Sequence, residues 1–151
     1  MAKLMVTICA CVLLSACNHT SVKKITNLLE QQIEADNYYA QDQCEKALPL
    51  YKELSQAMLT DTNSLLRMGN CYAREQNYSQ AERAYILALE RDPSFIKAWY
   101  NLSYIRARIL ARTVSEMYKN VDPSSEDAEK IRALTVDILA PFNLELDMQH
   151  E

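Results

Sequence analysis

Apolar residues recur every three or four positions along most of the chain, which is the spacing of one face of an α-helix. The first such stretch runs from Ser21 to about Ala40, and after a polar turn at Gln41–Gln43 a second runs from about Cys44 to Met58. The apolar positions of the first stretch are Ile25, Leu28, Leu29, Ile33 and Ala35. A single glycine and four prolines leave little material for β-hairpins. The pattern therefore predicts an all-α fold.

The stretch Leu65–Pro93 predicts two amphipathic helices joined by a tight turn. Gly69 and Ala81 are small at the positions where the two helices must touch. Large side chains fill the space around them: Tyr72, Tyr78 and Tyr85. Pro93 ends the hairpin, because proline cannot continue a helix beyond its first turn.

Beyond this hairpin, helical spacing continues from Ile96 to about Lys119 without a turn, which predicts one long helix. The segment Asn120–Pro123 breaks the pattern. Ser124 or Ser125 can then cap a last helix over about residues 125–140, because a serine side chain accepts a hydrogen bond from the first turn. The residues expected on its buried side are Ala128, Ile131, Leu134, Ile138 and Leu139. Residues 141–151 are expected to form a loosely held tail.

The hairpin resembles the tetratricopeptide repeat, a 34-residue pair of helices with the pattern W-x2-L-G-x2-Y…A-x3-F…P. The matching residues are Gly69, Tyr72, Ala81, Tyr85 and Pro93, whereas Leu65 and Met68 replace the tryptophan and leucine. An offset of 34 makes residues 28–61 a first, degenerate repeat. Residues 96–102 match the start of a third repeat, which fails where Ser103 replaces the glycine and Arg106 the tyrosine. The alternative is an ordinary helical hairpin.

This resemblance implies a short right-handed helical solenoid over residues 22–140. It would contain about two repeats, an elongated helix and a C-terminal capping helix. Protein binding is the usual role of such a stack, and the first helix of each repeat lines its inner wall.

Residues 1–16 resemble a lipoprotein signal peptide, with Lys3 followed by the short apolar run Leu4–Leu14. The run Leu14-Ser15-Ala16-Cys17 resembles a bacterial lipobox, which implies cleavage before Cys17 and a covalent lipid on its thiol. Residues 17–21 would then be a lipidated tether. Asn18, in place of aspartate, implies the outer membrane, with the domain facing the periplasm. The alternative is an ordinary cleaved signal that leaves Cys17 free.

Cys44 and Cys71 are the two cysteines that remain after the lipobox. In the repeat alignment both should face the seam between repeats, and a periplasmic location permits oxidation. A disulfide between Cys44 and Cys71 is one hypothesis. Two buried free thiols are the other.

The sequence offers no support for an enzyme. His19 and His150 lie near opposite ends of the mature chain without partners for a metal site, and nucleotide-binding and hydrolase motifs are missing. No cofactor is expected apart from the lipid on Cys17. The net charge of −4, without a dense Lys/Arg patch, argues against nucleic acid.

The resemblance assigns a partner-binding groove to the first helices of the later repeats. Its residues are Leu66, Asn70, Arg74, Lys97, Tyr100, Asn101, Tyr104 and Arg108. Cations beside aromatic rings suit a peptide that carries a carboxylate or acidic side chains. Asn70, Lys97 and Asn101 partly resemble the carboxylate clamp of chaperone-binding members. The alternative is that Tyr100 and Tyr104 pack against a neighbouring helix.

These expectations combine into an outer-membrane-anchored periplasmic adaptor that binds another envelope protein. Lipoproteins of similar build assist pilus and secretin assembly, so a secretin or pilus component is one expected partner. The alternatives are a scaffold for peptidoglycan hydrolases or outer-membrane protein insertion, and a structural subunit of an envelope machine. The partner's identity and the oligomeric state stay open.

Overall fold

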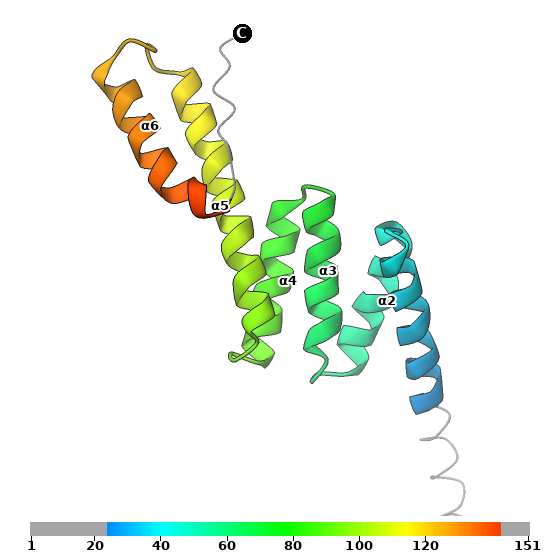
Figure 1. Ribbon diagram of the computed structural model, residues 1–151. Helices are drawn as coiled ribbons and strands as arrows, with labels where there is room; N and C mark the ends of the chain where they lie inside the picture. Colours follow the sequence, from blue (N-terminus) through cyan, green and yellow to red (C-terminus); the bar gives the residue numbers. More distant parts are fainter. Residues whose placement is uncertain (1–23, 143–151) are drawn as a thin grey trace, which may run out of the picture. The chain divides into compact units, whose positions relative to one another are not determined.

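The computed structural model describes residues 24–142, and every regular element in that range is helical (Figure 1). A first helix covers residues 24–40. It is followed by α2 (Cys44–Ala57), α3 (Thr62–Arg74), α4 (Tyr78–Arg91), α5 (Ile96–Lys119), α6 (Glu126–Leu139) and a short 3-10 turn, η1 (Ala140–Phe142). The prediction of an all-α fold is confirmed. The predicted signal peptide, the tether and residues 143–151 of the tail lie outside the described residues.

The chain divides into two compact units between Met58 and Leu59. In the first unit, the helix over residues 24–40 and α2 form a hairpin whose buried residues include Ala35, Ala47 and Tyr51. The second unit contains α3, α4, α5 and α6.

The two hairpins repeat each other at an interval of 34 residues. The first helix ends at residue 40 and α3 at Arg74, and both ends of α2 lie 34 positions before those of α4. The connecting turns place Asp42 at φ 60° and Gln76 at φ 56°, in the left-handed region. This region is unfavourable for a non-glycine residue by about 1–2 kcal/mol. Both turns therefore need the same unfavourable backbone conformation at equivalent positions.

The repetition extends to side-chain hydrogen bonds. The Tyr51 hydroxyl donates to Asp36 Oδ1 over 2.8 Å, and the Tyr85 hydroxyl donates to Asn70 Oδ1 over 2.8 Å. Each tyrosine lies 34 positions from its counterpart, as does each acceptor. The sequence period is therefore a structural period in backbone and side chains alike.

A close approach between α3 and α4 holds the second hairpin together. A Cβ atom placed on Gly69 would lie 2.3–2.8 Å from three ring atoms of Tyr85. These distances are shorter than any van der Waals contact, so only glycine fits. Ala81 and Tyr85 are both buried on the facing helix.

The two halves of the long α5 pack against different helices of the second unit. Its first half packs on α3 and α4 through Ala98, Leu102 and Ile105. Its distal half pairs with α6, which lies beside it in Figure 1, and buries Val114, Tyr118, Ala128 and Ile131. The predicted elongated helix is confirmed.

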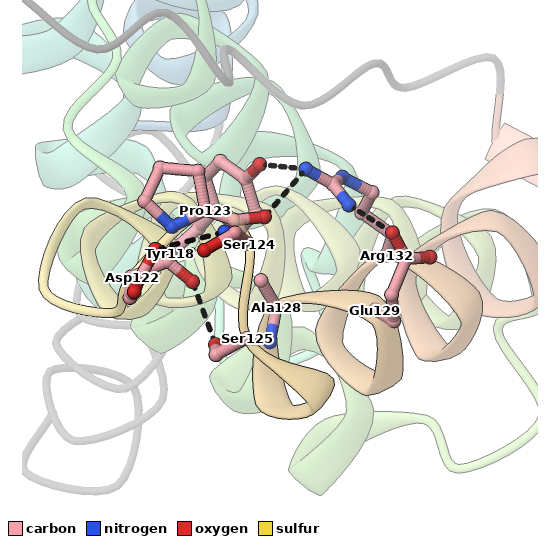
Figure 2. Close-up of polar contacts among 8 residues, drawn as sticks. All are labelled: Tyr118, Asp122, Pro123, Ser124, Ser125, Ala128, Glu129 and Arg132. Carbon is pink, nitrogen blue, oxygen red and sulfur yellow. Dashed lines mark hydrogen bonds and ion pairs between the residues drawn. The ribbon is translucent and has the colours of Figure 1, made fainter.

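Polar contacts fix the corner between α5 and α6 (Figure 2). Asp122 Oδ1 accepts hydrogen bonds from the Ser124 backbone N–H at 2.9 Å and from the Ser124 hydroxyl at 2.7 Å. Ser125 caps α6, because its Oγ accepts from the Ala128 N–H at 3.2 Å. Arg132 donates to the Tyr118 hydroxyl, and its guanidinium lies 5.2 Å from the centre of that ring. These bonds hold α6 against the end of α5.

Gly69→Ala tests the close approach of α3 and α4. The added methyl group must displace the Tyr85 ring, so we expect a net loss of about 1–3 kcal/mol in the free energy of unfolding. This loss should persist although alanine is favoured over glycine in a helix by roughly 1 kcal/mol. Urea unfolding measures it. Ser103→Ala is the matched control, because Ser103 is exposed on α5 at the equivalent position. A change below about 0.5 kcal/mol is expected there, and equal losses in both variants would contradict the account.

Asp122 provides a pH test of the corner. The two bonds from Ser124 stabilise the carboxylate and lower the pKa of Asp122 from its ordinary value of 3.8. The pKa of Asp122 is lower in the folded state than in the unfolded state. The carboxylate therefore stabilises the fold at pH values above the unfolded-state pKa, and this stabilisation is lost as the pH falls through the folded-state pKa. An NMR titration of the Asp122 carboxyl carbon should give a midpoint below 3.8. Ser124→Ala should raise that midpoint, and a wild-type midpoint at or above the ordinary value would refute the assignment.

Candidate functional site

A hydrogen-bonded set of three side chains joins α3, α4 and α5. Asn70 Oδ1, on α3, accepts from the Tyr85 hydroxyl of α4 at 2.8 Å and from Asn101 Nδ2 of α5 at 2.7 Å. All three side chains are partly or fully buried. The two asparagines that the sequence assigns to ligand binding are therefore bonded to each other, and they fix α5 relative to α3.

Next to Asn101, one face of α5 carries cations and tyrosines at helical spacing. Lys97, Tyr104, Arg108 and Arg112 share this face, and all but Tyr104 are exposed. Tyr100 lies beside them and is 70% exposed. We call these five residues the α5 basic face.

Two arginine–tyrosine pairs organise the α5 basic face. Arg108 donates from Nη2 and Nε to the Tyr104 hydroxyl, at 2.7 and 3.1 Å, and its guanidinium lies 5.3 Å from the centre of the ring. This hydrogen bond raises the pKa of Arg108, so the side chain stays charged. Arg112 lies 5.3 Å from the ring of Tyr78 at the start of α4. The rings therefore support two exposed guanidinium groups.

Other predicted groove residues lie in different surroundings. Leu66 belongs to the core between α3, α4 and α5 and exposes little surface. Arg74 is exposed at the end of α3. Tyr104 is half-buried and contacts both the main core and the small cluster of Ala107 and Leu139. Its ring therefore packs against neighbouring helices, while its hydroxyl group holds Arg108.

Arg112 lies outside the site that the sequence predicts. Its position four residues after Arg108, one helical turn farther on, was the available signal. Tyr78 was expected only as a packing residue, and its contact with a guanidinium group required the structure.

The arrangement suits binding through charge and stacking. Guanidinium groups bind carboxylates with two hydrogen bonds, and tyrosine rings offer apolar faces to side chains or peptide planes. Within residues 24–142, no group of three or more His, Cys, Asp or Glu residues could hold a metal ion. None of the helices in the same range is both long enough and apolar enough to cross a bilayer.

Cys44 and Cys71 are both buried and both in the disulfide-bonded state. The bond between these two cysteines stays a prediction.

No protein-family model matches the chain, and no curated protein matches it in a sequence search.

Asn70→Ala tests the three-helix hydrogen-bonded set. The change removes the acceptor for both the Tyr85 hydroxyl and the Asn101 amide, and a buried donor without an acceptor costs about 1–3 kcal/mol. Chemical denaturation should show a loss of that size. Asn63→Ala, at an exposed position near the start of the same helix, should change the free energy of unfolding by less than about 0.5 kcal/mol. If Asn70→Ala were as mild as the control, the set would not be holding α5 in place.

Proposed function

We propose that the chain is an outer-membrane-anchored, periplasmic tetratricopeptide adaptor that binds an acidic segment of another envelope protein. The observation that carries the proposal is the 34-residue repetition of helix ends, turns and tyrosine hydrogen bonds. It coincides with the positions at which the sequence resembles the repeat family. Such stacks work by presenting helix faces to other proteins.

The repeat assignment is supported by the steric roles of its key residues. Gly69 allows the Tyr85 ring to cross α3, and Ala81 is fully buried on the partner helix. Trp99 is the fourth residue of α5, as Leu65 is of α3. On this basis we assign a short right-handed solenoid of about two repeats, extended by α5 and closed by α6.

Membrane anchoring depends on the lipobox around Cys17. A covalent lipid there would keep the domain beside the membrane, since each buried methylene contributes about 0.8 kcal/mol. The outer membrane is proposed because asparagine follows the cysteine.

The ligand class follows from the α5 basic face. Lys97, Arg108 and Arg112 offer three cations along one side of a rigid helix, and Tyr100 offers an exposed ring beside them. An extended or helical segment with several carboxylates complements this surface. A secretin or pilus component is our first choice of partner, and proteins that insert outer-membrane proteins or cut peptidoglycan are the alternatives.

A second candidate function is that of a structural subunit locked into an envelope machine. Helix α4 packs against one face of α3. Within residues 24–142, the equivalent face of α5 has no helix packed against it in the same way. Leu65 is 3% exposed, whereas Trp99 at the equivalent position is 46% exposed. Leu110 and Met117 lie farther along the same side of α5 and are also partly exposed. An amphipathic helix of a partner, packed as α4 packs on α3, would cover it.

Charge reversal on the α5 basic face tests the adaptor function. Arg108→Glu with Arg112→Glu places two like charges against an acidic ligand, so recovery of the partner from detergent-solubilised membranes should fall about tenfold or more. Quantitative mass spectrometry of the affinity-purified material measures the loss.

The matched control is Arg83→Glu with Lys130→Glu, which makes the same change in net charge at exposed positions on α4 and α6. This control should retain the partner, and both variants should keep wild-type helicity. Equal recovery with both double variants would refute the assignment of the site. A stoichiometric complex that survives high salt and both double variants would favour the structural subunit.

A further inference from the structure

The first helix carries an apolar stripe that the domain leaves uncovered. Ile25, Leu29 and Ile33 are spaced four residues apart and are 66%, 60% and 54% exposed. Residues at this spacing lie on one side of an α-helix, so the three side chains form a row about 12 Å long. We call this row the Ile25–Ile33 stripe.

The core of the first unit uses a different side of the same helix. Ala35 is fully buried, and Gln31 donates to Glu53 Oε2 on α2 over 2.6 Å. Both side chains therefore face the hairpin partner. The stripe is thus an additional apolar face of the helix, beyond the one that packs in the core.

The stripe lies a few residues after Cys17 in the sequence, which indicates that a membrane covers it. Cys17 precedes Lys24, where the described helix begins, by seven residues. Even fully extended, those residues span no more than about 25 Å. If Cys17 carries the lipid, the start of this helix stays next to the bilayer surface.

We propose that the first helix lies on the membrane surface, with the Ile25–Ile33 stripe inserted at the boundary between headgroups and acyl chains. This inference rests on the proposed lipid anchor at Cys17 and adds an orientation to it. Helices with one apolar face bind membranes in this way, buried about 5–10 Å deep. Glu30 and Glu34 are exposed on the other side of the helix axis, so their carboxylates remain in water.

Lipid suits the stripe better than a second protein surface does. Three side chains fall far short of the roughly 800 Å² per partner that a stable protein interface buries. A lipid surface needs less area, because the anchor already supplies a high effective concentration of the helix at the bilayer. The stripe then prevents the domain from rotating freely about its tether.

Tryptophan fluorescence can locate the stripe directly. Leu29→Trp places a fluorophore in the stripe, whereas Asn27→Trp places one at an exposed site on nearly the opposite side of the same helix turn. The full, lipidated chain is reconstituted in vesicles of phosphatidylethanolamine and phosphatidylglycerol with brominated acyl chains. The signal of Trp99 in the unsubstituted chain is subtracted, and circular dichroism confirms the fold. We expect quenching of Leu29→Trp to exceed that of Asn27→Trp by roughly twofold or more.

Mass spectrometry of Cys17 in the same samples separates this inference from the anchor itself. An acylated chain with equal quenching at both positions would overturn the orientation and leave the anchor intact. An unacylated chain that does not bind vesicles would refute the anchor, and with it the orientation. Dimers in detergent-free solution that Leu29→Gln dissociates would assign the stripe to a second copy of the chain, which would also overturn the proposal.

Discussion

The second unit depends on the contact between Gly69 and the Tyr85 ring. Because glycine has no Cβ, the ring can cross α3, and its hydroxyl group then reaches Asn70. The same oxygen of Asn70 also accepts from Asn101, so the contact that closes one hairpin also fixes the next helix. Loss of the close approach would disturb both the α3–α4 pair and the placement of α5.

The position of α5 determines what the molecule can present to a partner. One side of its first half enters the shared core through Ala98 and Leu102, and the α5 basic face lies on another. Since α6 packs against the distal half, the side marked by Trp99 stays partly open. A single helix therefore presents both the α5 basic face and the partly open side marked by Trp99. The two candidate functions correspond to these two surfaces.

Local signals in the sequence predicted the helices, both turns and a serine cap at Ser124 or Ser125, because each depends on nearby residues. The bond between Asn70 and Asn101 joins residues 31 positions apart, and no local pattern specifies it. Helical periodicity also could not reveal that Ile25, Leu29 and Ile33 are exposed. Periodicity shows that a helix has an apolar side, but the packing of α2 decides which side is covered. The division into two units depends on the same long-range packing.

We propose that the α5 basic face contacts another envelope protein. The most direct measurement is photo-crosslinking in living cells, with a benzophenone amino acid in place of Tyr100, which is 70% exposed. The account predicts one dominant crosslinked partner at this position and none from the same probe at Arg83, an exposed site on α4. No crosslink at Tyr100, or the same products from both positions, would contradict it.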